Sequence, residues 1–284
     1  MTTERPIKKY LPIIIVAIVL YSLFAALTMF VASGATGAVD SAIEQTVYGW
    51  RSPGLNTLLE AITYCGNTAS IITLTLVLLA LPQTRIRYGL PVFIADVLTT
   101  ALKVVVKNLI ARPRPDAIYF LVPESGYSFP SGHSITSIAV YGMLAWLIWY
   151  YHKTDTAGAR RLAESPLAAT AEAAAAAKMP AKKRALMILC AFLSVAIGLS
   201  RIYVGVHHPT DVLGGFLAGI ATALLVLMAV VQTINSGVRM KVPFTALGDA
   251  ADTATSANAA ENAAAVALAD DTATDPAAPE EDAE

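Results

Sequence analysis

Three short polar segments of the sequence carry side chains that could bind a phosphoryl group and transfer it. They are KNLIARPRP at residues 107–115, SFPSGHS at residues 128–134 and SRIYVGVHHPTD at residues 200–211. Lysine and arginine hold phosphate oxygens through strong charge-assisted hydrogen bonds. A histidine can attack phosphorus or protonate a leaving oxygen. The three segments together predict phosphoryl-transfer chemistry, if the fold brings them to one place.

The third segment contains a histidine and a carboxylate at a spacing that suits a nucleophile. Pro209 indicates a helix start, and Asp211 in its first turn can accept a hydrogen bond from one ring nitrogen of His207. This bond would fix the tautomer and leave the lone pair of the other nitrogen free to attack. A His–Asp pair that only holds a loop would have the same pattern. For His208, which has no such partner in the sequence, we expect a helix-terminal or interfacial position.

The second segment predicts an anion site at the start of a helix. Pro130 is typical of a helix start, so the free backbone N–H groups of Ser131, Gly132 and His133 would lie at the positive end of the helix dipole. A turn that only caps a helix would explain the Pro-Ser-Gly run, but not the histidine beside it.

The composition makes a lipid bilayer the expected surroundings of these segments. Apolar residues make up 56% of the 284-residue chain and charged residues 14%, with a mean hydropathy of +0.58. Average soluble domains carry about 25% charged residues. The net charge of -1 leaves no basic stripe for a nucleic acid. A soluble enzyme, a disordered chain and a nucleic-acid binder are therefore disfavoured. Cys65 and Cys190 match no metal or redox spacing, which predicts buried apolar side chains.

Six segments approach the length of about 20 apolar residues that a membrane-spanning helix needs. They are residues 11–32, 58–81, 88–109, 132–150, 186–205 and 210–233. The second is the weakest, because Glu60, Asn67 and Thr68 interrupt it. The first is longer than the usual core of a signal peptide, which favours an uncleaved helix. We therefore expect an all-α, polytopic membrane protein whose six transmembrane helices form a bundle, the membrane domain at residues 11–233.

Basic residues set the expected orientation, because loops rich in Lys and Arg stay in the cytoplasm. With residues 1–10 inside, 14 of the 20 Lys and Arg residues fall on the cytoplasmic side. That side includes the loop at residues 151–185, with an Ala-rich stretch at 168–177 of high helix propensity. It also includes residues 234–284, whose Ala, Asp and Glu content predicts a disordered tail. The polar segments, and with them the active site, then lie at the outer face of a plasma membrane.

Six cations remain on or near the outer side, where the orientation rule would not place them. They are Arg51, Lys103, Lys107, Arg112, Arg114 and Arg201. Positive side chains near a membrane can simply extend to lipid headgroups, and for Lys103 and Arg112 that interpretation is as good as a functional one. The cations of the polar segments could instead neutralise a phosphoryl group, while one histidine attacks and the other protonates the leaving oxygen.

The spacing of these residues resembles the three-part signature of the type 2 phosphatidic acid phosphatase family. Lys107 is followed by six residues and Arg114-Pro115, then comes Pro130-Ser131-Gly132-His133, and then Ser200-Arg201, five residues, His207, three residues and Asp211. The resemblance covers residues 55–233. It implies an integral-membrane lipid phosphatase that forms a phosphohistidine intermediate and uses no metal and no cofactor.

The resemblance also implies a role for each matching residue. His207 would be the nucleophile, Asp211 its orienting partner and His133 the general acid. Phosphate-binding roles fall to Lys107, Arg114, Ser131, Gly132 and Arg201.

The substrate is less constrained than the reaction. The family includes phosphatases of undecaprenyl diphosphate, phosphatidylglycerol phosphate and phosphatidate, lipid phosphotransferases, soluble acid phosphatases and vanadium haloperoxidases. Six spanning helices argue against the last two. An outward-facing site favours undecaprenyl diphosphate, with a broad phosphatidate or phosphatidylglycerol-phosphate phosphatase, or a phosphotransferase, as the alternative. The expected partners are the lipid substrate and the bilayer, with no nucleic acid and no obligate protein partner.

A six-helix transporter is the alternative from a different class. Asp96 lies well inside the third span, and Lys103, seven residues later, lies near the same helix face, where the two could pair or contact a neighbouring helix. A transporter needs polar residues deep in several helices, whereas the polar segments here gather at one membrane face. The pattern therefore favours an enzyme.

Overall fold

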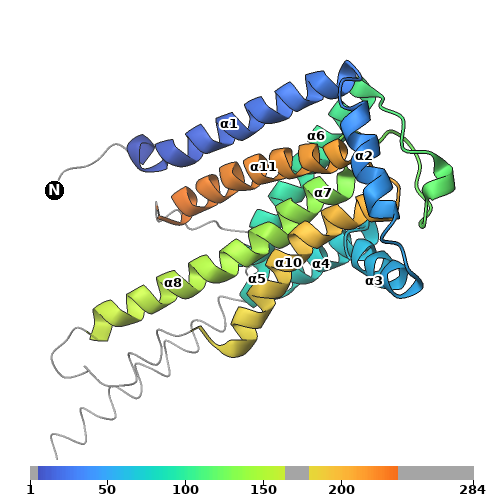
Figure 1. Ribbon diagram of the computed structural model, residues 1–284. Helices are drawn as coiled ribbons and strands as arrows, with labels where there is room; N and C mark the ends of the chain where they lie inside the picture. The colour runs from blue at the N-terminus through green and yellow to red at the C-terminus, as the bar shows by residue number, and fades with distance from the viewer. Residues whose placement is uncertain (1–5, 164–178, 236–284) are drawn as a thin grey trace, which may run out of the picture. The chain divides into compact units, whose positions relative to one another are not determined.

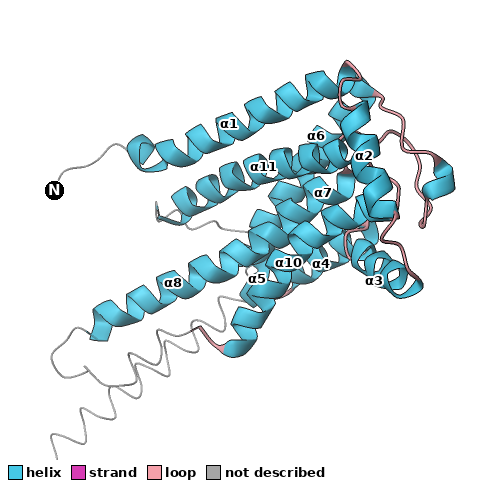
Figure 2. Ribbon diagram, in the orientation of Figure 1, coloured by secondary structure: helices cyan, strands magenta, loops and turns pink. Residues whose placement is uncertain are grey.

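The computed structural model describes residues 6–163 and 179–235, which form helices joined by loops, without a strand in either range (Figures 1 and 2). The main helices are α1 (Pro6–Ala32), α2 (Gly37–Tyr48), α3 (Pro53–Tyr64), α4 (Thr68–Ala80), α5 (Pro82–Thr84), α6 (Leu90–Ile110), α7 (Gly132–Ser137), α8 (Met143–Ala163), α10 (Ala181–Tyr203) and α11 (Pro209–Asn235). The π-helical turns η1 (Arg85–Gly89) and η3 (Ile138–Gly142) join α5 to α6 and α7 to α8, and η2 (Ala117–Tyr119) is a 3-10 turn. The all-α prediction is confirmed.

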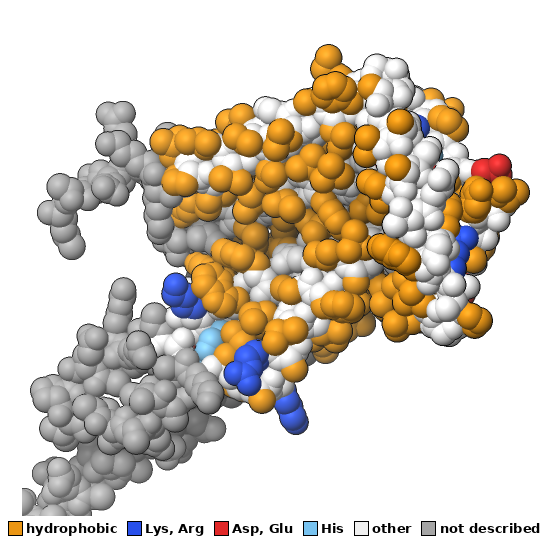
Figure 3. Space-filling view, in the orientation of Figure 1, with side chains coloured by type: hydrophobic (Ala, Val, Ile, Leu, Met, Phe, Trp, Pro, Cys, Tyr) orange, Lys and Arg blue, Asp and Glu red, His pale blue; other side chains and the backbone are white. Residues whose placement is uncertain are grey.

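Five helical segments of the described chain are long and apolar enough to cross a membrane. They are Tyr10–Ala32, Pro82–Ile110, Gly132–Thr156, Ala181–Tyr203 and Pro209–Val230. Large apolar side chains such as Ile18, Val97 and Phe192 are exposed along them, and Figure 3 shows apolar side chains over much of the visible face. Water is a poor solvent for such a surface and hydrocarbon is a good one. The chain is therefore a membrane protein.

The predicted second span, residues 58–81, is built from two helices. Helices α3 and α4 meet at an angle of 48° and together have the length and composition of a sixth span. Gly66 lies at the break because α10 passes close by: a Cβ on Gly66 would lie 2.3 Å from Cγ2 of Ile197. Asn67 then caps α4 by accepting the N–H of Ser70 at 2.8 Å. Two of the polar residues that weaken the sequence signal of this span, Asn67 and Thr68, thus mark its bend.

The span made of α7, η3 and α8 packs against α6, α10 and α11. Its Val140 and Leu147 are fully buried, in one cluster with Val92 of α6 and Ile197 of α10. Gly215 lets α11 approach α7, because a Cβ there would lie 2.9 Å from the carbonyl oxygen of Ser131. This close approach places the beginnings of α7 and α11 side by side.

Helix α2 is the element that the sequence pattern does not predict. It is a 12-residue amphipathic helix, too short to span a membrane, and it packs against α10 and α11. Asp40 and Glu44 lie one turn apart on its buried face, with Asp40 only 1% exposed. Figure 1 shows α2 across the end of the bundle where α10 ends and α11 begins.

Several predicted segments lie wholly or partly outside the described residues. Residues 1–5, the Ala-rich stretch at 168–177 and residues 236–284 of the predicted tail are not described. The predicted loop 151–185 is described at both ends, where it is helical: α8 continues to Ala163 and α10 begins at Ala181.

Candidate active site

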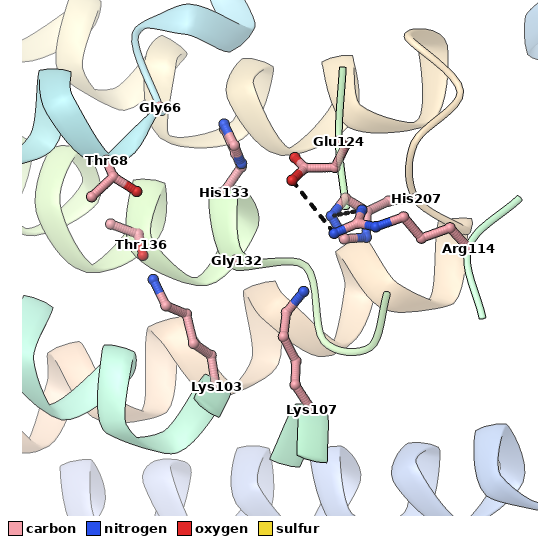
Figure 4. Close-up of a pocket in the computed structure, with 10 residues that line it drawn as sticks. All are labelled: Gly66, Thr68, Lys103, Lys107, Arg114, Glu124, Gly132, His133, Thr136 and His207. Atoms are coloured by element: carbon pink, nitrogen blue, oxygen red, sulfur yellow. Dashed lines mark hydrogen bonds and ion pairs between the residues drawn. The ribbon is translucent and has the colours of Figure 1, made fainter. Parts of the chain in front are cut away.

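The three polar segments meet at one end of the helix bundle. Lys107 lies in the last turn of α6, Arg201 in the last turn of α10, and His207 in the turn between α10 and α11. Lys107 and His207 line a cavity of about 180 Å³, whose other lining residues are Gly66, Thr68, Lys103, Arg114, Glu124, Gly132, His133 and Thr136 (Figure 4). A neighbouring cavity of about 260 Å³ shares Thr68, Glu124 and His133 with it and is also lined by Arg201.

His207 and Asp211 form the hydrogen bond that their spacing predicts. Nδ1 of His207 lies 3.2 Å from Oδ2 of Asp211, and Nε2 lies 3.1 Å from Nη1 of Arg114. Because an arginine can only donate, Nε2 must accept and Nδ1 must carry the proton. The Nε2 lone pair therefore points toward Arg114, and both residues line the cavity. Burial lowers the pKa of His207 well below its ordinary value, and the charges of Arg114 and Arg201 lower it further, so the ring is neutral.

Arg114 is fixed by the loop between α6 and α7. Its Nε donates to the carbonyl of Gly126 at 3.0 Å, Nη2 donates to the carbonyl of Ser125 at 2.9 Å, and Nη1 donates to the carbonyl of Val206 at 2.7 Å. Lys107 donates to the carbonyl of Tyr127 in the same loop. The loop thereby holds both cations at the cavity.

Glu124 bridges two of the arginines predicted to bind phosphate. Its carboxylate accepts a hydrogen bond from Nη2 of Arg201 and lies 3.6 Å from Nη2 of Arg114. Arg201 is only 2% exposed and also donates to Oγ1 of Thr63 at 2.9 Å, while its buried Nε finds no hydrogen-bond partner among the residues that the structure describes. A carboxylate thus binds where the arginines would hold a phosphate.

The start of α7 differs in one respect from the expected row of three free amides. The N–H of Ser131 donates to the carbonyl of Asp211 at 3.0 Å, and its Oγ caps α7 by accepting the N–H of Ser134. Ser131 is fully buried behind the cavity. Gly132 and His133, the first residues of α7, line the cavity, and their N–H groups have no acceptor within the helix.

Arg112 and Asp40 form a second group of charges, which contacts Asp211 on the side of Arg112. Arg112 donates from Nη1 to Oδ1 of Asp211 at 2.6 Å and from Nη2 to Oδ2 of Asp40 at 2.7 Å. Asp40 also accepts the backbone N–H of Thr210 at 2.9 Å. Arg112 therefore does not extend to lipid headgroups, and the alternative interpretation of this cation is wrong. Arg112 instead connects Asp40 of α2 to Asp211 at the start of α11.

His208 also has partners that its sequence position does not indicate. Its Nδ1 lies 2.6 Å from Oε1 of Glu44, and its backbone N–H donates to Oδ2 of Asp211 at 2.9 Å. The site thus contains three acidic residues that belong to none of the three polar segments: Asp40, Glu44 and Glu124. The six cations that the orientation rule would not place on the predicted outer side are the signal that could find them, because buried cations need nearby carboxylates. In the described part of the chain, no group of three or more His, Cys, Asp and Glu side chains is arranged to hold a metal ion.

The chain is similar to several known proteins. The family model of the PAP2 superfamily matches residues 86–235. Phosphatidylglycerophosphatase B of Bacillus subtilis is 29% identical over 209 residues, which are 73% of this chain and 91% of that protein. The undecaprenyl-diphosphatase of Sulfolobus acidocaldarius is 28% identical over 170 residues, which are 58% of this chain and 66% of that protein.

A solved structure is also similar. The crystal structure of a transmembrane PAP2-type phosphatidylglycerolphosphate phosphatase from Bacillus subtilis superposes with a TM-score of 0.58 at 26% identity, over 80% of this chain and 98% of that chain.

Proposed function

This chain belongs to the PAP2 superfamily, as its motifs indicate, and we propose that it hydrolyses the phosphate or diphosphate ester of a membrane lipid. The observation that carries the proposal is the state of His207. Asp211 holds its Nδ1–H, so the lone pair on Nε2 is left to accept from Arg114, in a cavity that Lys107 and Lys103 also line. A neutral, oriented imidazole at an anion site is what attack on phosphorus requires.

The proposed reaction has two steps. First, Nε2 of His207 attacks the terminal phosphorus, a bond between nitrogen and phosphorus forms, and the bond from phosphorus to the leaving oxygen breaks as His133 gives that oxygen a proton. Then water attacks the phosphohistidine, His133 takes a proton from the water, and inorganic phosphate leaves with His207 restored. Because His133 and His207 line the same cavity, one bound phosphoryl group can contact both.

The cations stabilise the negative charge of the transferred group. Lys107, Arg114 and Arg201 are the proposed phosphate ligands, together with the N–H groups at the start of α7 around Gly132. A phosphate bound there would replace the hydrogen bond from Arg114 to Nε2 and the carboxylate of Glu124 on the arginines. Ser131 would act indirectly, because it is buried and joins α7 to Asp211.

The proposed substrate is undecaprenyl diphosphate, and the proposed orientation puts the cavity at the outer face, with both termini in the cytoplasm. The orientation is supported by the distribution of Lys and Arg along the sequence. Phosphatidylglycerol phosphate is the second candidate, because the relative that aligns over 91% of its own length is named for that activity.

Purified protein in detergent tests the proposal. Wild type should release inorganic phosphate from undecaprenyl diphosphate, while His207→Ala should release none and His152→Ala, a histidine of α8 away from the cavity, should match wild type. We expect activity to persist in EDTA, because lysine and arginine neutralise the phosphate, and vanadate to inhibit. Wild type that releases no phosphate from any lipid phosphate, or full activity of His207→Ala, would refute the proposal.

A further inference from the structure

Lys103 lines the cavity but is not one of the signature residues, so the proposed reaction gives it no role. It lies one turn before Lys107 on α6, and both side chains point into the cavity (Figure 4). Its stem passes the start of α7, since a Cβ on Gly132 would lie 3.6 Å from Cδ of Lys103. Among the described residues, no hydrogen bond or ion pair engages its ammonium group. Lys103 therefore brings a positive charge to the cavity that no carboxylate there neutralises directly.

Thr136 supplies an independent sign that something binds beside Lys103. Its side chain lines the same cavity and is only 5% exposed, yet its buried Oγ1 has no hydrogen-bond partner in the described chain. A buried hydroxyl without a partner is unfavourable, and a helical threonine normally bonds a preceding carbonyl. A ligand oxygen at this point would satisfy it.

Lys103, Thr136 and Thr68 form a polar patch on one side of the cavity. Figure 4 shows this patch on the side away from Arg114 and His207, with His133 between the two. Thr68 belongs to the first turn of α4, whose positive dipole end also favours an anion. The patch thus has the chemistry of a second anion site, separated from the first by the proposed general acid.

We propose that this patch binds the second phosphate of a lipid diphosphate, the one that remains on the lipid after hydrolysis. The inference rests on the proposed function and specifies its substrate class. The terminal phosphorus bonds to His207, the bond from that phosphorus to the bridging oxygen breaks, and the bridging oxygen leaves on the lipid monophosphate with a proton from His133. Lys103 neutralises the charge that develops on this leaving group. A lipid monophosphate has no second phosphate that could occupy the patch.

Asp96 is the alternative partner of Lys103 that must be weighed. The two residues are seven positions apart on α6, but they form no ion pair within the described residues. Asp96 lines a different hollow, with Val97, Thr100, Ala101, Val104 and Val105, that excludes Lys103. Lys103 thus lines the cavity, whereas Asp96 does not.

The test compares undecaprenyl diphosphate with undecaprenyl monophosphate, which share one lipid chain. Lys103→Gln should lower kcat/KM for the diphosphate about tenfold more than for the monophosphate, as loss of a charge-assisted hydrogen bond predicts. Lys103→Arg should retain most of the preference, and Thr136→Val should lower it severalfold. Equal losses on both substrates would overturn the proposal. So would Asp96→Asn if it reproduced the Lys103→Gln pattern, because the lysine would then act through Asp96.

Inhibition supplies a readout that does not depend on turnover of the diphosphate. Methylenediphosphonate should inhibit hydrolysis of the monophosphate by wild type, and Lys103→Gln should weaken that inhibition about tenfold while inhibition by orthophosphate changes little. Equal weakening of both inhibitors would refute the second site but leave the phosphatase in place. Wild type without activity on either lipid would refute the proposed function itself.

Discussion

At the scale of single residues, the neutral state of His207 is set by its surroundings. Burial lowers its pKa well below the ordinary value of about 6.5, and the charges of Arg114, Arg201 and Lys107 act in the same direction. A lowered pKa keeps the ring unprotonated in mild acid. We therefore expect the His207 signals in a ¹⁵N-histidine NMR titration in detergent, assigned with His207→Ala, to stay those of a neutral ring through the pH range in which a free histidine becomes protonated. Titration near 6.5 would contradict this account.

Glu124 offers a prediction about competition for the arginines. Its carboxylate binds Arg201 and lies 3.6 Å from Arg114, so it would have to give way to a phosphate bound by these arginines as proposed. Glu124→Gln should remove this competitor and lower the inhibition constant of orthophosphate about three- to tenfold. Glu124→Asp, which keeps the charge, is the control. Weaker inhibition of the Gln variant would show that Glu124 helps to hold phosphate instead.

The residues of the site divide by how far sequence alone could identify them. His207 and Asp211 have a spacing that suits a nucleophile and its partner, and Lys107 and Arg114 match the family signature, so all four can be proposed without a fold. A carboxylate that balances these cations is under no such constraint, since any segment that folds back can supply it. Glu124 therefore becomes visible only in three dimensions.

At the scale of elements, α2 connects to the proposed catalytic pair, His207 and Asp211, through Arg112, which bridges Asp40 and Asp211. Both carboxylates are at most 1% exposed. Arg112→Met would leave two buried carboxylates without their cation, at a cost of about 3–5 kcal/mol in the free energy of unfolding. It should also lower kcat roughly tenfold or more, because Asp211 would no longer hold His207 in place.

A double variant separates these charge effects from lost packing. Arg112→Met with Asp40→Asn removes one of the two uncompensated charges, so its thermal unfolding midpoint in detergent should lie above that of Arg112→Met alone. If the double variant unfolds at the same or a lower temperature, Asp40 and Arg112 do not act as a charge pair.

Helix α2 and the bend at Gly66 are the parts of the fold that could not be predicted from the sequence. A bilayer demands long apolar runs, and five spans are therefore readable from hydropathy alone. Helix α2 has no such run, and its buried positions include Asp40 and Glu44, which a hydropathy pattern assigns to solvent. The bend at Gly66 depends on the approach of Ile197 from α10, a contact that no local pattern encodes.

At the scale of the whole molecule, the proposed threading separates the acidic tail from the cavity by the thickness of the bilayer. Deleting the residues after 245 should therefore leave phosphate release in detergent unchanged within about twofold. Size-exclusion chromatography checks that the truncated protein is folded. A folded truncated protein with a large loss of kcat would contradict the threading.

The orientation itself can be tested at the two ends of α10. Arg201 at one end bonds Glu124 of the cavity loop, and Lys182 lies about 30 Å away at the other end, by the rise of an α-helix. In a chain with Cys65→Ser and Cys190→Ser, Ser125→Cys marks the cavity end and Lys182→Cys the opposite end; both positions are exposed. A membrane-impermeant maleimide added to intact cells should label Ser125→Cys and spare Lys182→Cys, since the proposed orientation puts the Lys182 end, with its many basic residues, in the cytoplasm. In inside-out vesicles the pattern should reverse.

Labelling of Lys182→Cys alone in intact cells would place the cavity at the cytoplasmic face. A carrier-lipid substrate exposed at the outer face would then be out of reach.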